Sequence, residues 1–129
     1  MVIQTDRPPY SDRKISETFL DFASPLLDAL GAKATKDQIE EVLKIAFTVW
    51  NSVVFDTVNG NTRYVAKLRE LAAAESETRA LVEQMISRKQ TMFTDDHRLI
   101  GEYSVRHKNG EWRLRAEARD PGRPNVDDK

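Results

Sequence analysis

The sequence predicts an α+β fold that is predominantly helical, with about four helices around a central long helix and a C-terminal antiparallel β-hairpin. Three observations predict this fold. Apolar residues recur at helical spacing through most of the first 94 residues, and their spacing then changes to every second residue. The dipeptide Asn109-Gly110 is the strongest short signal for a two-residue hairpin turn.

The composition indicates one small domain. The chain has 129 residues, of which 40% are hydrophobic and 32% are charged, so it can bury a core but leaves no room for a second domain. Its 20 basic and 21 acidic residues give a formal net charge of -1. The overall charge therefore favours neither nucleic acid nor a membrane surface as a partner. We expect a single α+β domain over residues 14–119.

The residue types also exclude several classes of chemistry. Because the chain has no cysteine, it has no disulfide framework, no thiolate nucleophile and no cysteine-based metal site. Its N-terminal residues lack the apolar run of a signal peptide, and no segment has membrane-spanning length. We expect a cytoplasmic protein with no cofactor and no membrane partner.

The N-terminal part is expected to be an irregular leader followed by a helix. Residues 1–13 contain a pair of prolines, which disfavour helix, and apolar side chains recur at helical spacing over residues 14–30. Pro25 lies within this helix. It either kinks one helix or separates two pieces, the second capped by Ser24.

The second helix, predicted over residues 36–58, has the clearest pattern. Thr35 and Gln38 have the spacing of a capping box at its start. Its apolar residues cover more than half of its circumference, so we expect a central helix with neighbours on several sides. A turn is predicted at residues 59–61, where Asn and Gly tolerate left-handed backbone angles.

Two shorter helices are predicted next, over residues 62–73 and 77–94. We expect the third helix to turn inward Tyr64 or Val65, together with Leu68 and Leu71. The fourth helix carries one apolar stripe, which includes Met92. A helix with one such stripe is amphipathic and has a solvated side.

The hairpin is predicted over residues 98–107 and 111–119, and the turn fixes its register. One face pairs His107 with Trp112, Val105 with Leu114 and Tyr103 with Ala116, and we expect it to pack on the helices. The other face has an excess of arginine. Residues 120–129 are rich in proline and charge and are expected to be disordered.

Phe55 is the first candidate for a functional residue. It projects from the polar stripe of the second helix, next to Thr48, Asn51 and Ser52. An aromatic side chain among small polar neighbours suits contact with a protein partner or a second copy of the chain. The alternative is that the third helix or the leader covers Phe55.

The second candidate is a basic surface for nucleic acid. Residues 98–119 carry a local charge of +3, and helices followed by a basic hairpin resemble the order of a winged-helix domain. The residues that would contact nucleic acid are Arg106, Arg113 and Arg115 of the hairpin with Arg88 and Lys89 of the fourth helix. A charged but simply solvated hairpin face is the other interpretation.

The third candidate is a metal site in a small metal-dependent enzyme. Asp95, Asp96 and His97 form the densest group of possible ligands, but they are weak candidates, because we expect the two aspartates to end the fourth helix and turn the chain.

Two further charged residues lie among apolar ones. Lys89 falls inside the apolar arc of its helix and could be a buried base or nucleophile, but we expect its amine to reach water at the rim. Asp56 lies at the edge of the apolar arc of the second helix. It is either a perturbed carboxylate or half of an ion pair.

Taken together, these patterns favour a non-catalytic protein-interaction or self-associating module. A nucleic-acid-binding protein and a small metal-dependent enzyme are the alternatives.

Overall fold

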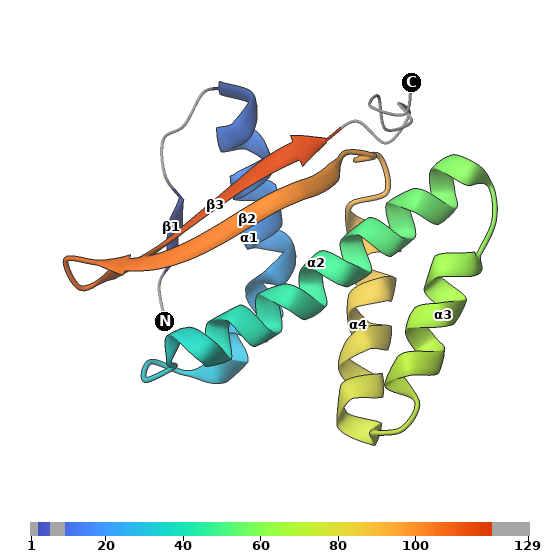
Figure 1. Ribbon diagram of the computed structural model, residues 1–129, viewed down its shortest axis with the longest axis horizontal. Helices are drawn as coiled ribbons and strands as arrows, with labels where there is room; N and C mark the ends of the chain where they lie inside the picture. The colour runs from blue at the N-terminus through green and yellow to red at the C-terminus, as the bar shows by residue number, and fades with distance from the viewer. Residues whose placement is uncertain (1–2, 6–9, 120–129) are drawn as a thin grey trace. The chain divides into compact units, whose positions relative to one another are not determined.

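The computed structural model describes residues 3–5 and 10–119 (Figure 1). The described chain confirms the predicted class, mostly helical with a C-terminal antiparallel hairpin. In chain order its elements are β1 (Ile3–Thr5), α1 (Tyr10–Leu30), α2 (Lys36–Asn59), α3 (Arg63–Ala72), α4 (Ser76–Met92), β2 (Leu99–Lys108) and β3 (Glu111–Arg119). The tail predicted to be disordered, residues 120–129, lies outside the described residues.

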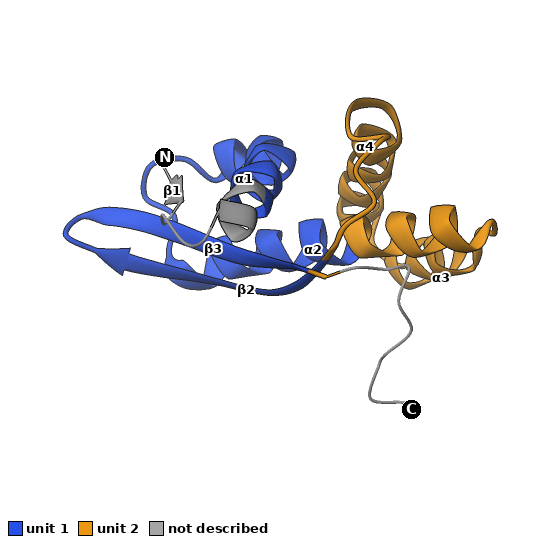
Figure 2. Ribbon diagram, turned by 90° about the horizontal axis from the view of Figure 1, so that it is seen from above, with its two compact units in different colours: residues 1–48, 100–118 blue, residues 49–99, 119–129 orange. Residues whose placement is uncertain are grey.

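The chain divides into two compact units (Figure 2). Unit 1 comprises residues 1–48 and 100–118, and unit 2 comprises residues 49–99 and 119–129. The division falls inside α2, so this one helix contributes its first half to unit 1 and its second half to unit 2. That the two units fold as a single domain stays a prediction.

Unit 1 contains a three-stranded sheet in the order β1-β3-β2. Strand β1 pairs in parallel with β3, with Ile3 opposite Trp112 and Thr5 opposite Leu114. The expectation of an irregular leader over residues 1–13 was therefore wrong for its described part, which holds β1 and the start of α1. Three residues are too few for an alternating pattern to reveal a strand, and the prolines precede α1 rather than interrupt it.

The hairpin has the predicted turn and pairing. Asn109 and Gly110 have φ angles of 53° and 78°, as a type I′ turn requires. His107 stacks on Trp112 with ring centroids 4.5 Å apart, which confirms that these side chains share a face. Val105, Leu114 and Ala116 are buried on that face as expected.

The core of unit 1 lies between α1, the first half of α2 and this sheet face. Its largest buried side chains on the helices are Ile15, Phe19, Phe22, Ile39 and Leu43. Tyr103 of β2 contacts Phe19 edge to face at 5.4 Å and Phe47 at 5.1 Å between ring centroids. Such aromatic pairs add to the free energy gained from burial.

Helix α1 is continuous through Pro25, so the alternative of two separate pieces was wrong. Proline has no N–H to donate to the carbonyl four residues earlier, which belongs to Asp21. Ser24 Oγ donates a hydrogen bond to that carbonyl at 2.8 Å. The hydroxyl thus supplies a donor at the position where the backbone cannot, and Ser24 acts inside the helix rather than as the cap of a second one.

The capping box at the start of α2 is confirmed. The backbone N–H of Thr35 donates to Gln38 Oε1 at 2.9 Å, and the N–H of Gln38 donates to Thr35 Oγ1 at 3.2 Å. At the other end, Asn59 is the last helical residue and Gly60 has a φ of 68°. The local sequence therefore determines both ends of this helix.

Unit 2 consists mainly of the second half of α2 with α3 and α4. Its core contains Trp50, Val53, Val54, Val65, Val82, Met85 and Ile86. The expectation that Leu71 turns inward was wrong, because Leu71 is 71% exposed, and Met92 of the α4 apolar stripe is also 65% exposed. On a helix, Leu71 lies about 120° around from the buried Val65, so both cannot face the same neighbour.

Candidate interaction surface

The position of α3 depends on a buried carboxylate in α2. Asp56 is only 5% exposed, and its two oxygens accept hydrogen bonds from the backbone N–H groups of Tyr64 and Val65, each at 2.9 Å. These amides belong to the first turn of α3, where no carbonyl of the helix itself can accept them. The carboxylate also complements the positive end of the helix dipole.

Asp56 is therefore a helix cap supplied by another helix, a role that neither sequence interpretation included. Asn61 completes the cap, because its Oδ1 accepts the N–H of Arg63 at 3.1 Å. Thr62, which occupies the cap position itself, makes no capping hydrogen bond through its side chain. Six residues separate Asp56 from the start of α3, so helix-end patterns in the sequence do not reveal this contact.

The same cap brings an aromatic pair together. Tyr64, whose amide Asp56 holds, stacks on Phe55, with ring centroids 5.2 Å apart and ring planes 28° apart. Phe55 is half-buried and Tyr64 is 50% exposed. The third helix therefore covers Phe55 in part through Tyr64, as the alternative predicted, and the stacked pair still presents aromatic surface. Contact of Phe55 with a protein partner stays a prediction.

Further apolar side chains extend this pair along two helix faces. On α3, Leu68 and Leu71 follow Tyr64 at spacings of four and three residues, which places the three on one face. On α2, Val58 follows Phe55 by three residues and is 41% exposed. We define the α2–α3 surface as Phe55, Val58, Tyr64, Leu68 and Leu71.

The polar neighbours proposed for Phe55 have different environments. Asn51 is half-buried and shares its helix face with Phe55 and Val58. Ser52 is buried at 9% exposure, so its assignment to a partner-binding surface was wrong. Thr48 belongs to unit 1, is exposed and donates its hydroxyl to the carbonyl of Lys44 at 2.8 Å.

Sequence reasoning missed Tyr64 and Leu71 because it counted them as candidates for the core. A signal was present: the apolar residues of α3 include Val65 and Ala72 as well, and together they span a wider arc than a ten-residue helix buries in this unit. An apolar arc wider than the contact face leaves its outer residues in solvent.

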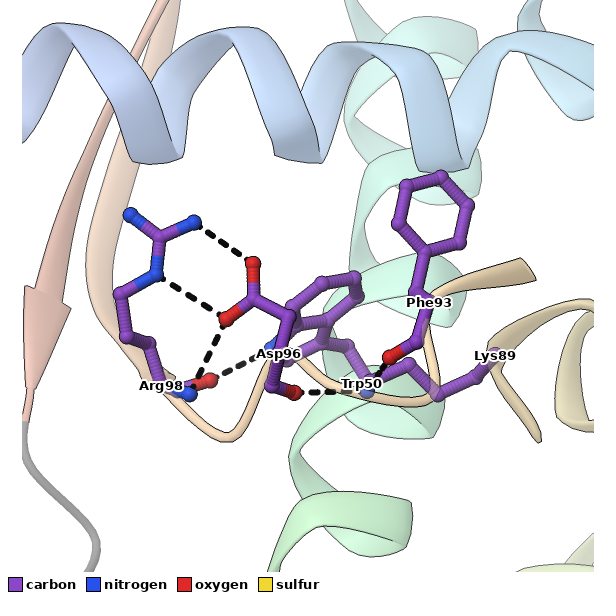
Figure 3. Close-up of polar contacts among 5 residues, drawn as sticks. All are labelled: Trp50, Lys89, Phe93, Asp96 and Arg98. Atoms are coloured by element: carbon purple, nitrogen blue, oxygen red, sulfur yellow. Dashed lines mark hydrogen bonds and ion pairs between the residues drawn. The ribbon is translucent and has the colours of Figure 1, made fainter. Parts of the chain in front are cut away.

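Lys89 lies in the interior of unit 2 (Figure 3). It is 2% exposed, and its amine donates hydrogen bonds to the carbonyls of Phe93 at 2.7 Å and Asp96 at 2.8 Å. The amine also lies 4.3 Å from the centre of the Trp50 ring, a cation–π distance. The expectation that it reaches water was wrong, and it is not on a surface that could contact nucleic acid.

Next to this lysine, Asp96 forms an ion pair with Arg98. Burial raises the pKa of Asp96, but the hydrogen-bonded Arg98 guanidinium outweighs burial and holds that pKa below its usual value. The two side chains form an ion pair at 2.6 Å. Burial lowers the pKa of Lys89 to about 8, against the opposing effect of the Asp96 charge.

The weak metal candidates do not converge. Asp96 uses its carboxylate on Arg98, while Asp95 and His97 are exposed. Among the described residues, no group of three or more histidine, aspartate or glutamate side chains is placed to hold a metal ion.

The arginines of the hairpin have acidic neighbours. Arg113 pairs with Glu111 at 3.3 Å, and Arg115 pairs with Glu117 at 3.7 Å. By strand alternation, the outward face that carries these four residues also carries Glu102, Arg106, Lys108 and Arg119. The face therefore keeps the positive excess that the sequence predicts, although Arg113 and Arg115 each have an acidic partner.

Arg88 also has intrachain contacts. Its guanidinium lies 5.4 Å from the centre of the Phe93 ring, and its Nη1 is 3.2 Å from the sulfur of Met92. The five basic residues proposed for nucleic acid therefore do not form one free surface: Lys89 is buried, and the others have acidic, aromatic or other intrachain neighbours.

Comparison of the chain with protein-family models, curated proteins and solved structures finds no match. Within the described part of the chain, no helix combines the length and apolar character needed to cross a membrane.

Proposed function

We propose that the chain is a non-catalytic protein-interaction module that binds a protein partner, or a second copy of itself, through the α2–α3 surface. The observation that carries this proposal is the Phe55–Tyr64 stack together with Leu71, which lies two turns further on the same face of α3 and is 71% exposed. A single exposed leucine is ordinary, but several exposed apolar side chains with stacked aromatic rings on one surface are characteristic of binding sites.

The construction of the surface supports the same proposal. Asp56 and Asn61 hold the first turn of α3, so Tyr64 is presented on a fixed backbone. Rigid aromatic side chains lose little conformational entropy on binding and dominate the affinity of many interfaces. On the outward face of the hairpin, in contrast, Arg113 and Arg115 pair with Glu111 and Glu117, which weakens their attraction for phosphate groups.

The test is a charge introduced at Leu71, the most exposed apolar residue of the α2–α3 surface. Leu71→Glu places a carboxylate where an apolar contact is proposed, without touching the stack that Phe55→Asp would break. Gln90→Glu is the matched control, because it adds the same charge at an exposed position of α4 outside the α2–α3 surface. Circular dichroism would establish that both variants keep the parent helix content.

Sedimentation equilibrium of the three proteins tests self-association, and their use as baits in quantitative affinity enrichment tests binding of another protein. We expect association, with itself or with a specific protein, to persist in Gln90→Glu and to weaken at least about tenfold in Leu71→Glu, because a charge then replaces an apolar contact in the interface. If the parent is monomeric and its bound proteins are equally retained by Leu71→Glu, the proposal is wrong.

A further inference from the structure

The Lys89 cluster belongs to unit 2 and lies beside two of the three points where the chain passes between its units. One point is inside α2, between Thr48 and Val49, and the other is between Leu99 and Ile100. Trp50 and Arg98 lie next to these points, both within unit 2. Trp50 Nε1 donates a hydrogen bond to the Arg98 carbonyl at 2.7 Å, so the two chain segments are joined there (Figure 3).

Lys89 attaches the connection between α4 and β2, residues 93–98, to the end of α4. Its amine binds the carbonyls of Phe93 and Asp96 and is covered by the ring of Trp50. A cation at the C-terminus of a helix is favourable because it neutralises the partial negative charge of the last carbonyls. Here one buried amine binds both the Phe93 carbonyl at the end of α4 and the Asp96 carbonyl in the connection that follows.

The far end of the connection is held separately. Asp96 Oδ1 accepts the backbone N–H of Arg98 at 3.2 Å, and the same carboxylate pairs with the Arg98 guanidinium. The connection is thus fixed at Phe93, Asp96 and Arg98, and the amine of Lys89 supplies the contacts at the first two.

We propose that Lys89 is a conformational latch: its amine holds residues 93–98 closed on α4, and this connection opens as a local unit, with α3 and α4 still folded, when the amine is removed. Without the amine, the carbonyl of Asp96 loses a buried donor, and the carbonyl of Phe93 keeps only the Asp96 amide, so both groups gain by turning towards water. The latch is independent of the proposed interaction surface, because none of its residues belongs to that surface.

Amide hydrogen exchange of the full chain, followed by NMR, tests the latch. The amides of Phe93, Asp96 and Arg98 report on the connection, since they donate to the Lys89 carbonyl, the Phe93 carbonyl and Asp96 Oδ1. The amides of Tyr64 and Val65 in α3 serve as references. In Lys89→Met we expect exchange of the three reporters to accelerate about tenfold or more, while the references change less than about twofold.

Lys67→Met is the matched control, because it makes the same substitution at an exposed lysine of α3. We expect it to leave the exchange rates of the three reporter amides and the two reference amides unchanged. Unchanged reporters in Lys89→Met, or equal acceleration of reporters and references, would overturn the latch.

The parent protein gives a second test that requires no variant to fold. Exchange through local opening is insensitive to low concentrations of urea, whereas exchange through global unfolding accelerates with urea. We expect the three reporters to be insensitive and the α3 amides to be sensitive. Reporter amides with the same urea dependence as α3 would show that the connection opens only when the whole unit unfolds, contrary to the proposal.

Discussion

At Lys89, burial and charge act on the amine in opposite directions. Burial disfavours the ammonium and lowers its pKa to about 8, while the nearby Asp96 charge raises it. The carbonyls that accept its hydrogen bonds remain satisfied by a neutral amine, which still has two N–H donors. Lys89 can therefore hold the two carbonyls in both protonation states, but burying its charged form costs free energy.

This cost predicts how stability depends on pH. The folded-state pKa of about 8 lies below the ordinary value of 10.5, so between these pH values the unfolded chain binds a proton that the folded chain has released. The free energy of unfolding should then rise with pH across this window, by up to about 3 kcal/mol.

Urea unfolding of the parent and Lys89→Met at pH 7, 8.5 and 10 measures this effect. Other groups titrate alike in both proteins, so the stability of the parent relative to the variant should increase with pH. A difference that stays constant over the three pH values would contradict a lowered pKa at Lys89.

Asp56 shows how one carboxylate can determine where a helix begins. We expect Asp56→Ala to lower the free energy of unfolding by about 2–4 kcal/mol, because it leaves two amides at a buried helix end without their charged acceptor. Asp56→Asn retains one carbonyl acceptor and should lose about half as much. Thermal and urea unfolding measure both, and Asp95→Ala, at an exposed carboxylate, should change stability by less than about 0.5 kcal/mol.

At the scale of elements, a side chain of α1 extends the hydrogen bonding of β3 beyond the pairs that it makes with β1. Strand β1 pairs with β3 only as far as Leu114. Two residues further on, Ser16 Oγ of α1 accepts the N–H of Ala116 at 2.8 Å and donates to its carbonyl at 3.1 Å. The hydroxyl thus satisfies both backbone groups of this buried residue.

Ser16→Ala should therefore be destabilising although it removes a single oxygen. We expect a loss of about 1–3 kcal/mol, since a buried N–H and a buried carbonyl both lose their partner. Ser104→Ala, at an exposed position of β2, is the control and should have little effect. Equal midpoints of urea unfolding for the two variants would contradict a role for Ser16 in completing the sheet.

At the scale of the whole molecule, α2 determines whether the units unfold together. It contributes Ile39, Leu43 and Ala46 to the buried residues of unit 1 and Val49, Trp50, Val53 and Val54 to those of unit 2. A helix cannot unwind in one half without losing hydrogen bonds next to the other half. We therefore expect one cooperative transition.

The chain has one tryptophan in each unit, Trp112 in unit 1 and Trp50 in unit 2, which makes this testable. Both can be labelled with fluorotryptophan and followed by ¹⁹F NMR as urea is increased. Coincident midpoints would support a single domain in the thermodynamic sense. Separate midpoints would show that the units are independent and that the single-domain prediction is wrong.

The sequence by itself determined the features whose partners are near in the chain. Thr35 and Gln38 are three residues apart and predicted the start of α2, and Asn109-Gly110 predicted the turn and the contact of His107 with Trp112. These interactions arise wherever the local chain folds, because the residues involved are adjacent.

Only the tertiary structure decided the features that depend on distant partners. Ser16 and Ala116 are 100 residues apart, and the three residues of β1 have no pattern until β3 lies beside them. The burial of Lys89 and the exposure of Leu71 depend equally on which neighbour each helix face meets. Periodicity gives a helix an apolar side, but the packing of other elements decides how much of that side remains open to a partner.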